Sequence, residues 1–210
     1  MALTLLEIDS SPLGSRSVSR HLTKEFVESW KAANPDGHVL TRDLNSTPIP
    51  PIDGTWVAAA YTPEAQQTAE QRDLLSLSDS LIAELQRADH YVFGVPMHNF
   101  SVPSVLKLWI DQVARVNKTF SYATGTPVGL LRGKKATIFV TSGGNYDAGT
   151  AMSSYNFVDP YLRAVLGFLG VTDVTVLTAG GASALSSGKV DRETFFEPHL
   201  ASIRAQFNAA

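Results

Sequence analysis

Short apolar runs alternate with longer amphipathic stretches along the chain. A bounded apolar run of four to eight residues is typical of a buried strand. The run at 91–95 is apolar throughout, as expected for a central parallel strand that is covered on both faces. Five such runs, of which the second is the weakest, predict strands at residues 3–8, 39–44, 91–95, 136–140 and 171–177.

Between these runs, apolar side chains recur at the spacing of a helix. The first helical stretch carries Val18, Leu22, Phe26 and Trp30 and ends at the turn sequence of residues 34–37. Further helices are predicted at about 63–87, at 105–116, and from Asp191, a plausible N-cap, to 207.

Alternating strands and helices favour right-handed β-α-β units, so we predict an α/β fold with a parallel sheet and helices on both faces. Two segments do not fit either pattern. The proline-rich stretch 48–51 is expected to be an exposed loop, and residues 119–133, rich in glycine and threonine, an excursion over the surface.

Length and composition narrow the class of protein. The 210 residues, 44% hydrophobic and 18% charged, predict one folded domain over residues 1–210. Basic and acidic residues number 17 and 20, and the net charge of -3 gives no basic footprint for nucleic acid. Because the chain has no cysteine, thiolate catalysis and iron-sulfur clusters are excluded, and redox chemistry requires a bound cofactor.

The chain also shows no sign of export or membrane insertion. Residues 1–9 lack a basic segment before their apolar positions, so they do not resemble a signal peptide. No apolar run reaches the roughly 18 residues that a membrane helix needs. We therefore expect a cytoplasmic protein that does not contact a membrane.

Chemically unusual residues follow the first, third and fourth predicted strands, at the sheet edge where open parallel sheets bind ligands. Residues 10–17 place four serine hydroxyls, a glycine and the guanidinium of Arg16 at the start of a helix. Free amides and the positive end of the helix dipole favour a phosphate there. The alternative is that Ser15 or Ser17 only caps the helix.

The loop after the third strand has a proline near each end, at Pro96 and at residue 103. A flavin needs amide donors and apolar walls, which Met97, Phe100 and Asn99 would supply. Alternatively, Met97 and Phe100 belong to the core and Asn99 to a turn. His98, in the same loop, could shuttle a proton or contact a substrate.

After the fourth strand, Thr141 and Ser142 precede Gly143 and Gly144, whose lack of side chains lets the backbone approach a ligand closely. Gly-Gly pairs also occur in ordinary turns. Motifs for dinucleotides (GxGxxG), nucleoside triphosphates (GxxxxGK[ST]) and serine hydrolases (GxSxG) are absent. The five histidines show no metal-ligand spacing, so no metal site is predicted.

Over nearly its whole length the chain resembles the FMN-dependent NADH:quinone oxidoreductases, also called azoreductases. The landmarks include SSPLGSRS at 10–17, PMHNF at 96–100 and the glycine pair at 143–144, which agree in spacing as well as identity. The resemblance implies a flavodoxin-like fold with strand order 2-1-3-4-5. It also implies a homodimer that reduces quinones and azo compounds by two electrons, with NADH or NADPH as donor, in a ping-pong reaction carried by FMN.

The resemblance also assigns residues by position. The FMN phosphate would be held by Ser11, Ser15, Arg16 and Ser17. The flavin ring would be lined by Pro96, Met97, His98, Asn99 and Phe100, and closed over by Thr141, Ser142, Gly143 and Gly144. Phe120 would face the substrate.

The chain departs from the family at His98, where tyrosine is common, and at Thr141–Ser142, where the family commonly has Ser-Arg before the glycine pair. These changes are expected to alter the flavin potential or the choice of acceptor. A flavodoxin-type electron carrier, which binds FMN but consumes no nicotinamide nucleotide, is the alternative function. A flavin-free scaffold is a third possibility, because fold alone does not fix function.

Overall fold

The computed structural model describes residues 2–46 and 48–207. At its centre is a parallel five-stranded sheet with the order β2-β1-β3-β6-β7. The strands are β1 (Thr4–Asp9), β2 (His38–Asp43), β3 (His90–Pro96), β6 (Lys135–Thr141) and β7 (Asp173–Ala179). Numbered by themselves, these strands have the order 2-1-3-4-5, so the predicted flavodoxin-like topology is confirmed.

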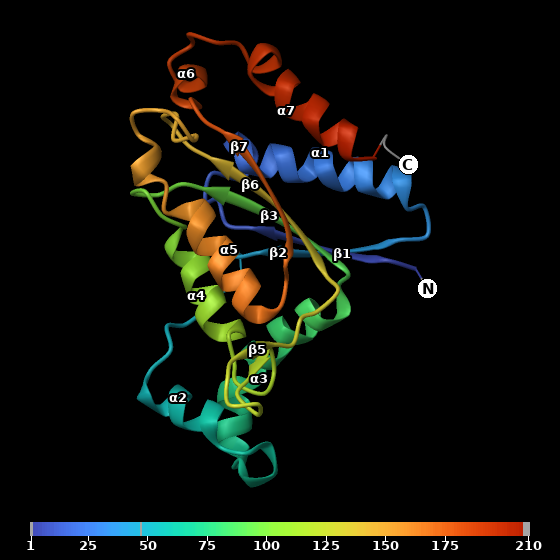
Figure 1. Cartoon of the computed structure of the whole chain (residues 1–210), viewed down its shortest axis with the longest axis vertical. Coiled ribbons are helices and arrows are strands. Elements are labelled where there is room, and N and C mark those ends of the chain that lie inside the picture. Colours follow the sequence, from blue (N-terminus) through green and yellow to red (C-terminus); the bar gives the residue numbers. More distant parts are fainter. Residues whose placement is uncertain (1, 47, 208–210) are drawn as a thin grey trace.

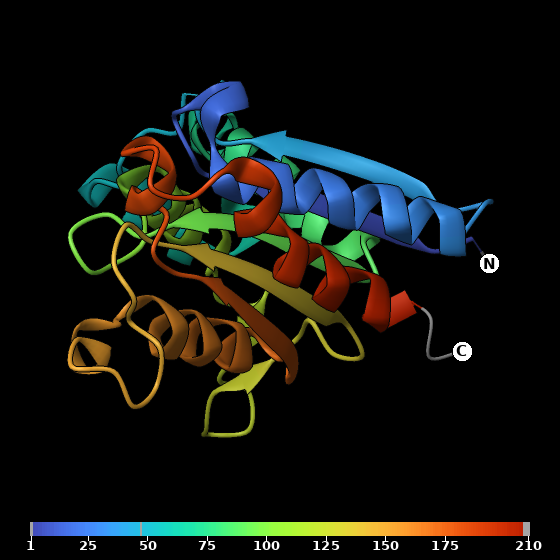
Figure 2. The same ribbon diagram turned by 90° about the horizontal axis from the view of Figure 1, so that it is seen from above.

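Helices cover both faces of the sheet (Figures 1 and 2). One face carries α1 (Val18–Ala33) and α7 (Arg192–Phe207), and the other carries α3 (Ala69–Arg87), α4 (Ser104–Val113) and α5 (Val158–Leu169). The short helix α6 (Ser183–Ser186) lies in the connection from β7 to α7. No helix in the described ranges is both long enough and apolar enough to cross a membrane.

Two separate cores result because neighbouring side chains of a strand point to opposite faces. In β3, Val92 packs under α1 and α7 with Phe26, whereas Tyr91 and Phe93 pack under the other helices. Tyr91 and Val92 are both fully buried. A strand in this position cannot carry a polar face, which explains the uninterrupted apolar run at 91–95.

The region between β2 and β3 differs from the prediction. The helix expected from about residue 63 begins only at Ala69, because Thr68 and Gln71 form a capping box that fixes the start of α3. An unpredicted helix, α2 (Gly54–Tyr61), precedes it and begins where Asp53 accepts a hydrogen bond from the Trp56 amide (2.8 Å). Helix α2 packs on α3, at the lower end of the molecule in Figure 1.

Residues 119–133 are not wholly the surface excursion that the sequence predicted. They form a small antiparallel hairpin of β4 (Phe120–Ser121) and β5 (Val128–Gly129). Phe120 and Leu131 are buried, and a Cβ on Gly129 would lie 2.1 Å from the Gly170 nitrogen. The hairpin is therefore pressed against the end of α5, which the apolar pattern had not predicted.

Candidate functional site

A cavity of about 630 Å³ lies at the carboxyl ends of the sheet strands. The loops after β1, β3, β6 and β7 all contribute to its wall, which is where the topology of an open parallel sheet places a ligand. Nine of the predicted residues line it: Ser11, Arg16, Ser17, Pro96, Met97, His98, Thr141, Ser142 and Gly143. The three loops with unusual residues, which lie far apart in the sequence, therefore contribute to the wall of one cavity.

The loop after β1 enters α1 through a 3-10 turn (Gly14–Arg16). Ser17 is the N-cap of α1, because its Oγ accepts a hydrogen bond from the Arg20 amide (3.2 Å). The same side chain also lines the cavity. Ser17 is therefore a helix cap, and its contact with a ligand stays a prediction, whereas Ser15 does not line the cavity.

Arg20 fastens this loop from beneath. Its Nε and Nη2 donate to the Ser11 carbonyl (3.0 and 2.8 Å), and Nη2 also donates to Asp43 (2.6 Å). Its Nη1 lies 3.5 Å from Asp9, which accepts a hydrogen bond from Thr23 (3.0 Å). Burial raises the pKa of the Asp9 carboxyl to about 6, and the hydrogen bond from Thr23 and the charge of Arg20 offset only part of that effect.

Gly94 in β3 lets the loop pack directly on the strand. The amide and hydroxyl of Ser10 both donate to the Gly94 carbonyl (3.1 and 2.7 Å). A Cβ on Gly94 would lie 2.5 Å from the Asp9 Oδ1 atom, which is closer than real Cβ contacts. Only glycine leaves room for the buried acid beneath the loop.

The loop after β3 contains a tight turn. His98 and Ser101 exchange two backbone hydrogen bonds (2.9 and 3.0 Å), and the residues between them, Asn99 and Phe100, have φ angles of 48° and 72°. Such angles are uncommon outside glycine, and Asn tolerates them better than most residues do. Asn99 is therefore a turn residue, and neither it nor Phe100 lines the cavity.

Phe100 instead belongs to an aromatic cluster beside the cavity. Its ring centroid lies 5.2 Å from that of Tyr155 and 6.2 Å from that of Tyr146. The side chain is 39% exposed, so the alternative that Phe100 is a core residue is wrong. Gly144, which the family resemblance also assigns to the flavin site, likewise lies outside the cavity lining.

The loops after β6 and β7 are bonded to each other. The Ser142 carbonyl accepts from the Ala182 amide (2.9 Å), and the Gly143 carbonyl accepts from the amide and hydroxyl of Ser183 (3.2 and 2.7 Å). The Gly144 carbonyl accepts from the Ser142 hydroxyl (2.8 Å). Three consecutive carbonyl oxygens are thus engaged within the protein, and so is the Ser142 amide, which donates to the Ala179 carbonyl (3.2 Å).

Residues that the sequence analysis missed also line the cavity: Leu13, Val18, Ala182, Ser183, Leu185, Ser186 and Arg192. Most of them follow β7, whose loop begins with the glycine pair 180–181. The rule that located the other loops, chemically unusual residues at the carboxyl end of a strand, would have found this one. The complete lining contains two arginines and no acidic residue, although the chain has a net charge of -3.

Phe120, predicted to face the substrate, lies in the β4–β5 hairpin and not in the cavity wall. It is 7% exposed, and its ring centroid lies 4.7 Å from that of Phe168 and 5.6 Å from that of Tyr122. Phe168 and Tyr122 are 40% and 51% exposed. A substrate contact of Phe120 stays a prediction.

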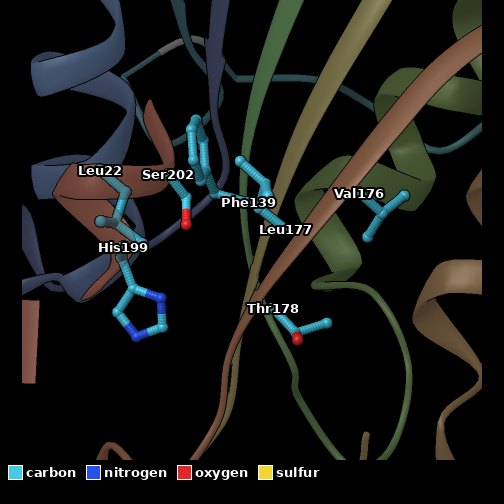
Figure 3. Close-up of a pocket in the computed structure, with 7 residues that line it drawn as sticks. All are labelled: Leu22, Phe139, Val176, Leu177, Thr178, His199 and Ser202. Atoms are coloured by element: carbon cyan, nitrogen blue, oxygen red, sulfur yellow. The ribbon is translucent and has the colours of Figure 1, made fainter. Parts of the chain in front are cut away.

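A second, smaller cavity of about 220 Å³ lies between α1, α7 and the edge of the sheet. Its wall combines Leu22 and Phe139 with the imidazole of His199 and the hydroxyl of Ser202 from α7 (Figure 3). It holds none of the predicted site residues. We therefore regard the larger cavity as the functional site.

Sequence comparison agrees with this fold. A family described by its flavodoxin-like fold matches residues 4–206. The chain is 60% identical over 202 residues to the FMN-dependent NADH:quinone oxidoreductase of Acidobacterium capsulatum, an overlap of 96% of this chain and 98% of that protein. It is 43% identical to FMN-dependent NADH:quinone oxidoreductase 3 of Burkholderia lata, over 97% of this chain and 98% of that one.

Solved structures resemble the chain over nearly the full length of both proteins. An FMN-dependent NADH-azoreductase from Bacillus anthracis, crystallised in complex with FMN, has a TM-score of 0.85 at 26% identity, covering 98% of each chain. An azoreductase from B. anthracis strain Sterne has a TM-score of 0.87 over 99% of this chain and 100% of its own. At 24% identity, the second likeness concerns the fold alone.

The fold and the sequence relatives together define a flavodoxin-like oxidoreductase. The chain belongs to the family of FMN-dependent NADH:quinone oxidoreductases, because its sequence identity to those proteins extends over nearly the whole length of both aligned chains. The family resemblance predicted from the sequence is confirmed.

Proposed function

We propose that this chain is an FMN-dependent NADH:quinone oxidoreductase that reduces quinones and azo compounds by two electrons in a ping-pong reaction. NADH or NADPH is the donor. The observation that carries the proposal is the larger cavity, whose volume of about 630 Å³ is in the usual range for small-molecule sites. Its wall combines hydroxyls and guanidinium groups with apolar side chains, and it contains no acid that would repel a phosphate.

The residues present fit FMN. At the start of α1, Ser11, Arg16 and Ser17 offer hydroxyl, guanidinium and helix-end donors for the phosphate, and Ser15 is exposed beside them. Pro96, Met97 and His98 would line the flavin ring on one side, with Thr141, Ser142 and Gly143 on the other. Asn99, Phe100 and Gly144 belong to the loops that shape this wall. When bound, FMN supplies the chemistry of accepting a hydride and passing on two electrons.

The protein's own contribution is to hold these groups in place. Arg20 fixes the Ser11 carbonyl from beneath, so the phosphate loop is ordered before the cofactor arrives. Met97 and Leu13 give part of the cavity wall an apolar surface. His98 is exposed at the wall, where it can contact a substrate or exchange a proton with solvent.

The test is anaerobic mixing of the FMN-loaded protein with NADH. We expect rapid bleaching of the flavin absorbance, followed by recovery when a quinone is added. A flavodoxin-type carrier would bind FMN yet show no bleaching by NADH. Protein that stays colourless after incubation with FMN would exclude both functions and leave the flavin-free scaffold.

The homodimer that the resemblance implies is also part of this proposal. Exposed aromatic and apolar side chains cluster beside the cavity: Phe100, Met152, Tyr155 and Phe157 are 39%, 39%, 45% and 55% exposed. Clusters of this kind on a soluble protein mark interaction surfaces. Light scattering should give twice the chain mass of 22.6 kDa, and a monomer at micromolar concentration would contradict the dimer.

A further inference from the structure

Arg192, the first residue of α7, lines the larger cavity although it is far in sequence from the loops at 10–17, 96–100 and 141–144. Its guanidinium carbon lies over the ring of Phe196, 5.0 Å from the centroid. Phe196 is 3% exposed and is itself held edge-on by His21, with ring centroids 4.2 Å apart. The cation therefore rests on a fixed aromatic surface.

Within the described ranges the guanidinium of Arg192 contacts the Phe196 ring but is not neutralised by an ion pair. The adjacent acid, Asp191, accepts hydrogen bonds from the amide and hydroxyl of Thr194 (2.9 and 2.7 Å) and so caps the start of α7. Across residues 2–46 and 48–207 no acidic side chain forms an ion pair with Arg192. A guanidinium held on an aromatic ring, facing a cavity without acids, is suited to an anionic ligand.

We propose that Arg192 is a second phosphate-binding residue of this cavity, in addition to Arg16, and that it binds a phosphate monoester. The inference rests on the proposed function, which brings two such groups to the site: the phosphate of FMN and, if NADPH is the donor, its 2′-phosphate. Both present a doubly charged group to a planar guanidinium, which binds it through two parallel hydrogen bonds. Because FMN and NADPH present the same phosphate chemistry, the experiment must distinguish which of the two Arg192 binds.

The test compares Arg192→Gln with a control, Arg204→Gln. Arg204 lies on the same helix, is half exposed and pairs with Glu197 at the surface, outside the cavity lining. Apoprotein is titrated with FMN and with riboflavin, which lacks the phosphate, and the quenching of flavin fluorescence is followed. For Arg192→Gln we expect the Kd for FMN to rise about tenfold and that for riboflavin to stay unchanged, as one charge-assisted hydrogen-bonding group is lost.

A second arm measures KM for NADPH and for NADH in the FMN-saturated protein. If FMN binding is unchanged and only the KM for NADPH rises, Arg192 binds the phosphate of the donor, which also supports the inference. Arg192→Lys should recover part of the lost affinity, because it keeps the charge without the planar fork.

Two results would overturn the inference: equal weakening of FMN and riboflavin, or no change with any phosphate-bearing ligand. Equal weakening would mean that Arg192 acts through the packing of α7, which thermal unfolding of the variant would show directly. Failure of the proposed function is a separate outcome, because the unmodified protein would then either bind neither flavin or bind FMN without being bleached by NADH.

Discussion

Replacing Arg20 by methionine tests how the phosphate loop is held. The change keeps an unbranched side chain but removes the donors to the Ser11 carbonyl and the positive charge beside Asp9. Loss of the hydrogen bonds to Ser11 should lower the free energy of unfolding by about 1 kcal/mol at any pH. Loss of the charge adds a contribution that depends on the ionisation of Asp9.

The sign of that contribution follows from the pKa of Asp9, which burial raises from 3.8 to about 6. The folded protein retains a proton that the unfolded chain releases, so stability falls as the pH rises from about 4 to about 6. The difference between the two pKa values corresponds to a cost of about 3 kcal/mol for ionised Asp9 above pH 6. Without Arg20 this cost increases, because the nearby positive charge is lost.

We therefore predict that Arg20→Met lowers the free energy of unfolding by about 1 kcal/mol at pH 5 and by about 2–3 kcal/mol at pH 8. Urea unfolding of the apoprotein, followed by far-ultraviolet circular dichroism, measures both values. In an Asp9→Asn background the loss should be the same at both pH values. Lys24→Met, on the same helix and 70% exposed, should change stability by less than about 0.5 kcal/mol. An equal loss for Arg20→Met at pH 5 and pH 8 would refute this explanation of the loop.

Three further predictions concern the strand, the turn and a partly buried histidine. Gly94→Ala should weaken FMN binding at least about tenfold in a fluorescence titration, because the alanine Cβ would lie 2.5 Å from Asp9. An unchanged affinity would contradict the packing described for the loop after β1. Asn99→Ala should lower flavin retention more than His98→Ala does, because alanine tolerates the φ of 48° poorly, whereas Asn99→Gly should retain the cofactor. If His98→Ala abolishes flavin reduction while FMN stays bound, His98 has a catalytic role instead. Burial lowers the pKa of His90 to about 4, with Lys135 contributing, so the unfolded chain binds the proton first and stability falls as the pH drops from 6.5 towards 4. His90→Gln should flatten that part of the thermal unfolding profile, and an unchanged slope would mean that another group titrates.

The sequence was sufficient for the parts of the fold that depend on burial. Strands such as β3 are buried on both faces, so their apolar runs have no polar interruption and their positions could be predicted within a residue or two. The same strand ends located Ser11, Met97 and Gly143, because the carboxyl ends of parallel strands meet at one edge. These inferences needed only local patterns and a topological rule.

The remaining features depend on contacts between distant residues. Arg192 reaches the cavity because α7 returns across the sheet to pack on α1, which no local pattern encodes. The position of Phe100 outside the cavity follows from the left-handed turn at 99–100, which depends on the paired backbones of His98 and Ser101. The boundary of α3, by contrast, was visible in the capping sequence at Thr68 and was missed because the helical spacing was extended too far.

The most direct measurement of the central claim is a crystal structure of the protein with FMN. The account predicts the phosphate at the start of α1, within hydrogen-bonding distance of Ser11 or Ser17, and the flavin ring between the loops that follow β3 and β6. FMN bound elsewhere, for example in the smaller cavity between α1 and α7, would contradict it.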